Sequence, residues 1–122
     1  VEVVEFPELN HDEPYFYGQT YNGRNNYITY IPGNIPMILS ISHGGNIYPE
    51  EIPDRSYGTF VTDSNTIELG MSISNQFFQK FNVRPYMIIN NLDRVKLDAN
   101  RDKSEAAQGN IFAERSFDEV HN

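Results

Sequence analysis

Two short apolar runs on either side of an amphipathic stretch constrain the fold more than any other feature of this sequence. The runs MILSIS (residues 37–42) and YMIIN (residues 86–90) are mostly apolar, which is typical of strands buried on both faces of a sheet. Between them, apolar residues recur at roughly helical spacing from Ile67 to Phe81. A strand, a helix and a second strand form a βαβ unit. We therefore expect an α/β fold with a mixed, largely parallel sheet flanked by helices.

The ends of the helix are marked by residues that start or stop regular structure. Asp63 or Ser64 is a suitable N-cap, because a short polar side chain can accept a hydrogen bond from the first free backbone N–H groups. Arg84-Pro85 interrupts the helical pattern before the second strand. The helix is therefore expected between these two points.

An N-terminal β-hairpin is expected before the βαβ unit. Two Tyr-rich stretches (residues 15–21 and 27–31) flank Asn22-Gly23, and Asn-Gly is a common two-residue hairpin turn. Residues 1–14 are acidic and contain two prolines, so we expect them to form an extended segment that precedes the hairpin.

The chain of 122 residues is long enough for one domain with a core and too short for two. We therefore expect residues 1–122 to form a single domain, with its α/β portion in residues 15–112. Residues 113–122 are expected to be helical, and the sequence stops there without a capping residue. This ending predicts an incomplete fold, of which the chain is the N-terminal portion.

Composition limits the partners and the ligands. The chain has 9 Lys and Arg against 17 Asp and Glu, and its net charge of −8 argues against binding to a nucleic-acid backbone. No stretch approaches the ~20 apolar residues of a membrane span. Cysteine is absent, so any transition-metal site must use His, Asp and Glu. The chain begins with Val1, which slightly favours a processed, secreted protein.

His43 is the first candidate for chemistry, because it follows the first apolar run directly. Ligands and catalytic groups in α/β sheets gather at the carboxyl ends of strands. Gly44 and Gly45 carry no side chains and would let a substrate or metal approach closely. The alternative is a hydrogen-bonded structural histidine, and position alone does not choose between the two.

A metal at His43 needs further ligands from the rest of the chain. Asp63 is suitable because it opens the following helix, although the same position suits a helix cap. Glu50 and Glu51 are alternatives on the intervening loop, where acidic side chains are usually only solvated charges.

The charged segment NLDRVKLDANRD (residues 91–102) follows the second apolar run and is the other candidate. Arginine binds carboxylates through two parallel hydrogen bonds, and asparagine can add a third. The alternative is a solvated loop with surface salt bridges. If the segment is extended, alternate side chains share one face, and these are Arg94, Lys96, Asp98 and Asn100. Arg101 would then lie on the turn beyond.

Four motifs between about residue 26 and residue 107 resemble one known family. They are NYITYIPGNIPMILSISHGGNIYPEEIPDR, TDSNTIEL, RPYMIINNLDRVKLDANR and EAA, in this order. They are similar to the N-formylglutamate amidohydrolase-like proteins, a family related to zinc carboxypeptidases. The resemblance implies an α/β sheet with one zinc ion, held by a histidine, an acid and a second histidine. It also implies hydrolysis of an amide next to a carboxylate by a water activated on zinc.

Carried over to this sequence, the resemblance assigns roles to single residues. His43 becomes the first zinc ligand, and Asp63 is the favoured acidic ligand, with Glu50 or Glu51 as weaker alternatives. The pair Asn100-Arg101 would clamp the carboxylate of the substrate. Arg94 would stabilise the negative charge that develops on the amide oxygen.

The third zinc ligand is expected on later strands, beyond the helix at residues 113–122. His121 lies in that helix and is a poor substitute, and His11 in the acidic N-terminal segment is a weaker one. The main hypothesis is therefore the N-terminal part of a zinc amidohydrolase, completed by a downstream segment or a partner chain. The alternative is a non-catalytic, structural or self-assembling extracellular protein that forms homo-oligomers through an exposed sheet edge.

Overall fold

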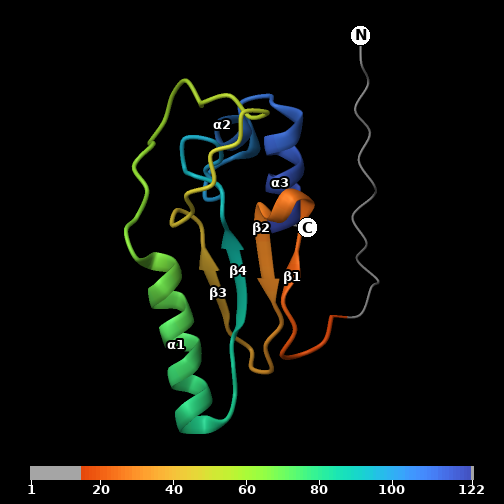
Figure 1. Ribbon diagram of the computed structural model, residues 1–122, viewed down its shortest axis with the longest axis vertical. Coiled ribbons are helices and arrows are strands. Elements are labelled where there is room, and N and C mark those ends of the chain that lie inside the picture. The colour runs from red at the N-terminus through yellow and green to blue at the C-terminus, as the bar shows by residue number, and fades with distance from the viewer. Residues whose placement is uncertain (1–14, 122) are drawn as a thin grey trace.

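The computed structural model describes residues 15–121 and contains a mixed four-stranded sheet (Figure 1). The strand order is β1-β2-β4-β3, in which β4 lies between β2 and β3. Only β3 and β4 pair in parallel, and the other two pairs are antiparallel. The strands are β1 (Tyr21–Asn22), β2 (Ile28–Ile31), β3 (Ile38–Ile41) and β4 (Tyr86–Asn90).

The expected α/β class with a mixed sheet is confirmed for the described residues, but the expectation of a largely parallel sheet is wrong. The crossover from β3 through the helix to β4 gives a parallel pair, as a βαβ unit must. The returning strand β4 then takes the place beside β2, which runs in the opposite direction. One βαβ unit therefore supplies one parallel pair, and the hairpin side of the sheet stays antiparallel.

The predicted hairpin is present, but its turn is longer than two residues. Asn22 pairs with Thr29 inside the ladder of β1 and β2 instead of lying in the turn. The connection contains a short 3₁₀ helix (Arg24–Asn26) in which Asn25 adopts a positive φ of 54°. The N–H of Gly23 donates to the carbonyl of Ile28 at 2.8 Å and closes this wider loop.

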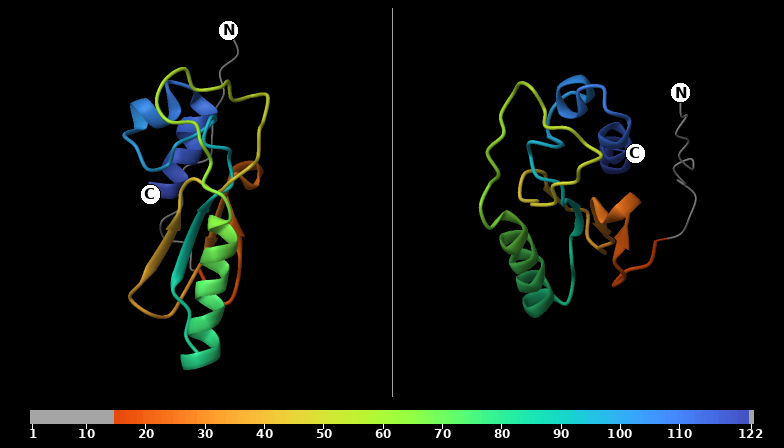
Figure 2. Two further views of the ribbon diagram at one scale, coloured as in Figure 1. Left: turned by 90° about the vertical axis from the view of Figure 1, so that its left-hand side faces the viewer. Right: turned by 45° about the horizontal axis from the view of Figure 1, so that its top comes forward.

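The helix α1 (Thr66–Phe81) lies against one face of the sheet, beside β3 and β4 (Figure 2). It begins after Asn65, so the expectation that Asp63 or Ser64 caps the helix is wrong. Gly70 is buried at the contact, where a Cβ atom would collide with the side chain of Ile41. The missing side chain therefore lets the helix approach the sheet closely.

The two predicted strands differ in burial. In β4, Met87 and Ile89 are buried, as expected of a central strand. In β3, the expectation of burial on both faces is wrong, because β3 is an edge strand and the side chain of Ile38 is 71% exposed. An apolar run thus predicted both strands but not which of them would have a second neighbour.

Two helices, α2 (Lys103–Ala107) and α3 (Ile111–His121), cover the end of the sheet at which β3 and β4 finish (Figure 1). The helix expected at residues 113–122 begins two residues earlier than predicted, and Asn122 lies outside the described residues. The members of the core beneath these helices are Tyr27, Ile52, Leu92, Leu97, Ala106, Ala107 and Ala113.

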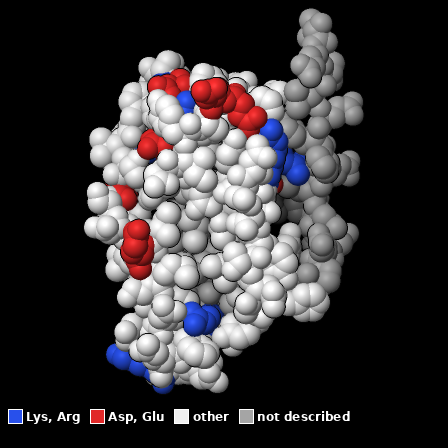
Figure 3. All heavy atoms as spheres, in the orientation of Figure 1, with Lys and Arg blue, Asp and Glu red and all other residues white. Residues whose placement is uncertain are grey.

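Charged side chains are unevenly distributed over the face drawn in Figure 3. Acidic groups gather toward the upper end of the view, near α2 and the loops, and a broad middle area carries no charged side chain. Within the described part of the chain, no helix has the length and apolar character needed to cross a membrane.

Candidate functional site

The side chain of Asp98 is fully buried and lies at the centre of the candidate site. Its Oδ1 atom lies 2.6 Å from Nε2 of His43 and accepts the N–H of Asn100 at 3.1 Å. Its Oδ2 atom accepts a hydrogen bond from Nε of Arg94 at 3.0 Å. A buried carboxylate is stable only when its oxygens are paired, and here both are.

Three guanidinium groups surround this one carboxylate. Arg94 is closest, and nitrogen atoms of Arg55 and Arg101 lie 3.9 Å and 4.0 Å from Oδ2 of Asp98. Burial alone would raise the pKa of the Asp98 carboxyl, but the hydrogen bonds from His43, Arg94 and the N–H of Asn100 outweigh it and lower that pKa. Three guanidinium groups therefore lie within 4.0 Å of one carboxylate, although the whole chain is acidic.

His43 follows the carboxyl end of β3, and its two ring nitrogens face two different carboxylates. Nε2 lies 2.6 Å from Asp98, and Nδ1 lies 3.3 Å from Oδ2 of Asp63. If Nε2 carries the proton toward Asp98, Nδ1 of the neutral ring presents a lone pair toward Asp63. A lone pair facing a carboxylate is favourable only with a cation or a proton between them.

Asp63 is brought to this position by the loop that precedes α1. Its N–H donates to the carbonyl of His43 at 2.8 Å, so the two residues are linked through the backbone as well as the side chains. The side chain of Asp63 is 53% exposed and remains accessible from solvent. The structure therefore brings together the histidine and the acid that the sequence suggested.

The segment 91–102 is not extended, so the expected alternation of its side chains is wrong. The N–H groups of Lys96 and Leu97 both donate to the carbonyl of Asp93, which closes a turn. Lys96 consequently points away from His43, and its Nζ donates to the carbonyl of Ile52 at 2.6 Å. The turn still brings Arg94 and Asp98 together.

Asn100 and Arg101 lie at the rim of the site. Asn100 is exposed and lines the same groove as His43 and Asp63. The side chain of Arg101 is 37% exposed, and its Nη1 donates to the carbonyl of Asn100 at 2.8 Å. Arg94 is less accessible, because its buried side chain also donates to the carbonyl of Val61 at 3.2 Å.

The other acids and histidines named as ligands lie elsewhere or have other partners. Glu51 is bound by Arg24 at 2.6 Å, and it also accepts the hydroxyl of Tyr27. Glu50 is exposed on the loop. His121 uses Nε2 to contact the carbonyl of Ala99 at 2.9 Å. His11 lies outside the described residues.

Gly44 and Gly45 have a structural role that the sequence interpretation missed. A Cβ atom on Gly44 would collide with the side chain of Thr66, at the start of α1. A Cβ atom on Gly45 would collide with the backbone of Asn90 and Asn91, which follows the neighbouring strand. The two glycines therefore permit close approach of other parts of the chain.

A groove of about 410 Å³ runs between β3 and α1 and reaches the site. Ile38 and Leu69 contribute apolar walls, and the end of the groove is formed by His43, Asp63 and Asn100. An apolar passage that ends at polar groups is a usual form of a small-molecule site.

The resemblance implies zinc, and the donors fit zinc in part. Carboxylates that hold the second nitrogen of a metal-binding imidazole are common, and Asp98 has this relation to His43. Catalytic zinc usually has three protein ligands. Among residues 15–121, however, no group of three or more His, Asp or Glu side chains is arranged to hold a metal ion. Of the ligands expected from the sequence, the described residues bring together only His43 and Asp63.

Comparison of the chain with protein-family models, with curated proteins and with solved structures finds no significant match. The likeness to the N-formylglutamate amidohydrolase-like proteins therefore rests on the sequence motifs alone.

Sequence reasoning did not single out Arg55, and it named Asp98 only as one of four side chains on a shared face, without a role. One signal for Asp98 was available, because this acid lies between the apolar residues Leu97 and Ala99 within a charged segment. Such a flank favours burial, and a buried acid requires partners. No comparable signal marks Arg55.

Proposed function

We propose that this chain is the N-terminal part of a zinc-dependent amidohydrolase or exopeptidase-like protein that hydrolyses an amide next to a carboxylate. The observation that carries the proposal is the arrangement of His43 between Asp98 and Asp63. Asp98 contacts Nε2 of the ring, and Nδ1 is left facing the carboxylate of Asp63. The motif resemblance described above is the second support.

His43 and Asp63 would hold the zinc ion, and zinc would supply a Lewis acid that polarises the amide carbonyl and acidifies a water. Asn100 and Arg101 lie at the rim, where they can bind the carboxylate of the substrate. Arg94 is proposed to offset the negative charge that develops on the amide oxygen. The part-exposed guanidinium group of Arg101 at the rim supports a substrate that carries a carboxylate.

The remaining zinc ligand is proposed to come from polypeptide outside the described residues, either a downstream segment or a partner chain. Within residues 15–121 β3 is an edge strand, and its outer edge is the natural place for this polypeptide to join. In the parallel pair, the carbonyl of Met37 accepts the N–H of Tyr86, so by alternation the backbone groups of Ile38 and Ser40 face away from β4. A strand added there would end beside His43.

Zinc titration by calorimetry tests the metal assignment on residues 1–122. We expect one zinc per chain, bound weakly because two ligands hold it, and a loss of affinity of at least about tenfold in His43→Ala. His11→Ala is the control for nonspecific binding by histidine and should behave like the unaltered chain. Equal zinc affinity in His43→Ala and the unaltered chain would contradict the proposal.

The substrate assignment requires the complete protein. Arg101→Ala should abolish hydrolysis of N-acylated acidic amino acids, because the carboxylate of the substrate loses its bidentate partner. Arg84→Ala is a matched control, since Arg84 binds Ser74 and Asn75 away from the site. Full activity in Arg101→Ala would remove the carboxylate clamp from the proposal.

A second candidate function is self-assembly as a structural protein, and the open edge of β3 favours it. Residues 34–42 contain no charged side chain, so nothing opposes pairing with the edge of another copy. Ile38→Lys should then abolish concentration-dependent association in sedimentation experiments without unfolding the chain, because Ile38 is already exposed. Ile111→Lys, at an exposed apolar position away from β3, should leave association unchanged. A chain that stays monomeric at all concentrations would exclude this function.

A further inference from the structure

Arg55 directs its guanidinium group at the backbone of three separate segments. Its Nε donates to the carbonyl of Arg94 at 2.9 Å. Nη1 donates to the carbonyls of Tyr57 at 3.2 Å and Glu105 at 3.3 Å, and Nη2 donates to the carbonyl of Thr59. The side chain is 1% exposed, so these contacts replace water almost completely.

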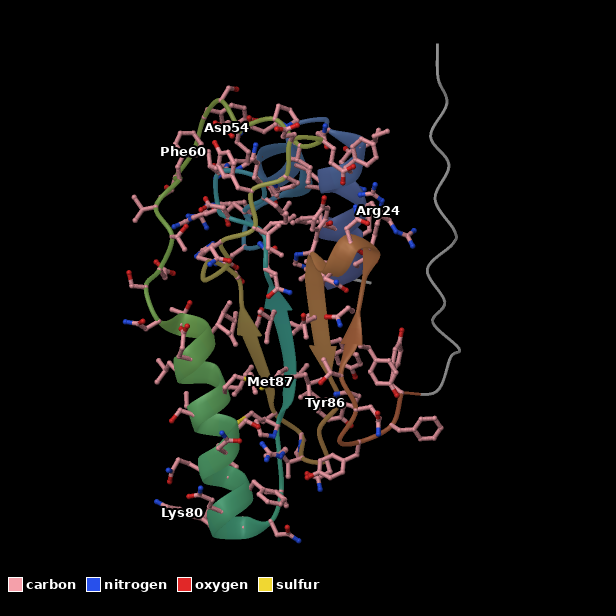
Figure 4. The ribbon with its side chains drawn as sticks, in the orientation of Figure 1. Arg24, Asp54, Phe60, Lys80, Tyr86 and Met87 are labelled. Carbon is pink, nitrogen blue, oxygen red and sulfur yellow. The ribbon has the colours of Figure 1, made fainter. Side chains whose placement is uncertain are left out.

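The segment that Arg55 holds leads directly to Asp63. Residues 57–63 belong to a long loop without helix or strand, visible at the upper left of Figure 4 where Phe60 is labelled. The ring of Phe60 covers the guanidinium group of Arg55 at 5.2 Å. Further along, Arg94 binds the carbonyl of Val61, and the N–H of Asp63 binds His43.

A loop of this kind needs such anchors, because it has few other ways to fix its backbone. Each carbonyl that is bound by the buried guanidinium group restricts the conformations open to the loop backbone. Hydrogen bonds to charged groups are also stronger than those between neutral groups. Burial lowers the pKa of Arg55, while the nearby carboxylate of Asp98 raises it. Burial is the larger of the two effects, so the pKa of Arg55 is lowered overall, and Asp98 offsets only part of the cost of burying this charge.

We propose that Arg55 is a positioning residue that sets the loop carrying Asp63 against His43. The inference rests on the proposed function, in which Asp63 is a zinc ligand and the loop serves to position it. Arg55 itself touches no substrate or metal. Lysine cannot replace it, because an ammonium group lacks the planar fork that reaches the Tyr57, Thr59 and Arg94 carbonyls at once.

Hydrogen exchange on residues 1–122 without metal tests the positioning role. In Arg55→Lys we expect the N–H of Asp63 to exchange at least about tenfold faster, while the N–H groups of β4 keep their protection. Arg84→Lys is the matched control, because it makes the same change at an arginine whose side chain binds Ser74 and Asn75 of α1, and it should leave Asp63 unchanged. Unchanged exchange at Asp63 in Arg55→Lys overturns the inference.

A second variant covers the case in which Arg55→Lys fails to fold. A Cβ atom on Gly58 would lie 2.8 Å from Oε1 of Glu105 and 2.9 Å from Nη1 of Arg55, so Gly58→Ala pushes against the guanidinium group without removing its charge. Gly109→Ala is its control, because Gly109 also has a positive φ but has nothing within 4 Å of the added atom. We expect faster exchange at Asp63 in Gly58→Ala alone, and equal exchange in both variants would contradict the inference.

Zinc titration of the same variants separates this inference from the proposed function. Arg55→Lys should raise the zinc dissociation constant by about 10- to 100-fold, the range seen when the support of a metal ligand is disturbed. If the unaltered chain binds no zinc, the proposed function fails, and the exchange rate of Asp63 still decides whether Arg55 positions the loop. If zinc binds but the exchange is unchanged, only the role of Arg55 fails.

Discussion

At the scale of single residues, Asp98 is the group on which most of the site depends. It is the only described carboxylate that lies within 4 Å of the three guanidinium groups of Arg55, Arg94 and Arg101. Arg55 and Arg94 are themselves buried. Removing the negative charge would leave two buried cations without it, which is far more costly than losing a surface ion pair.

Asp98→Asn should therefore lower the free energy of unfolding by about 3 to 5 kcal/mol, because breaking one side of a buried charge cluster leaves the other side uncompensated. Urea unfolding followed by circular dichroism measures the change. Asp102→Asn provides the control, since Asp102 is exposed and makes no side-chain cap for α2, and its cost should stay within about 0.5 kcal/mol. A loss below about 1 kcal/mol in Asp98→Asn would show that the arginines do not depend on this carboxylate.

The sequence predicted some site residues and missed others for a physical reason. His43 could be placed because strand ends collect functional groups, and Asp63 because it follows the same loop toward α1. The interactions of Asp98 and Arg55 depend on their being buried, and burial depends on which segments fold over a residue. Their burial is decided by the turn at residues 93–97 and by the path of the loop at residues 57–63. Neither can be read from the spacing of apolar residues in the sequence.

At the scale of elements, β4 was predictable from a short apolar run, and α1 from apolar residues that recur at helical spacing. The order and direction of the strands were not, since they depend on pairing between segments far apart in the sequence. For example, Thr29 of β2 lies opposite Ile89 of β4 in an antiparallel pair. This pair and the pair of β1 with β2 make most of the sheet antiparallel. A local pattern records which residues seek burial but not which neighbour provides it.

The loop that follows β3 and His43 depends on Gly45 for its close packing. Gly45→Ala should destabilise the chain by about 2 to 4 kcal/mol, because the new methyl group meets the backbone of Asn90 and Asn91, which cannot move like a side chain. The backbone there is also fixed by the hydrogen bond from Ile47 to Asn91. Thermal and urea unfolding measure the loss.

Gly18→Ala is the control for the glycine substitution. Gly18 has a positive φ of 84° and open space around it, so an alanine there pays only the cost of the backbone conformation, about 1 kcal/mol. Gly45 has no positive φ, so a loss in Gly45→Ala no larger than that in Gly18→Ala would show that the close approach to Asn90 and Asn91 does not explain Gly45.

At the scale of the whole molecule, a small number of charged groups tie together segments that are distant in the sequence. Glu51 on the long loop binds Arg24 and Tyr27 of the hairpin. Glu119 of α3 accepts the N–H of Arg24 at 3.0 Å, at the place where Arg24 is labelled in Figure 4. The hairpin, the loop and the last helix are thus connected near one arginine, apart from the cluster around Asp98.

This connection predicts a particular loss of stability in acid. The hydrogen bond from Arg24 lowers the pKa of Glu51 to about 2, against the opposing effect of burial, and the hydroxyl of Tyr27 contributes in the same direction. Because the folded pKa lies below the value of 4.5 for a free side chain, the stabilisation is complete above about pH 4.5 and is lost as the pH falls toward about 2. With partial solvent screening, it amounts to roughly 2 kcal/mol.

Glu51→Gln isolates this contribution, because the variant keeps Asp98 and every other acid. We expect the variant to be less stable than the unaltered chain by roughly 2 kcal/mol near neutral pH, and the two stabilities to converge as the pH approaches 2. Urea unfolding at a series of pH values measures both curves. Glu50→Gln, a change at the exposed neighbouring acid, should follow the unaltered chain at every pH. A constant difference between Glu51→Gln and the unaltered chain from neutral pH to pH 2 would show that the charge of Glu51 does not hold the hairpin to the loop.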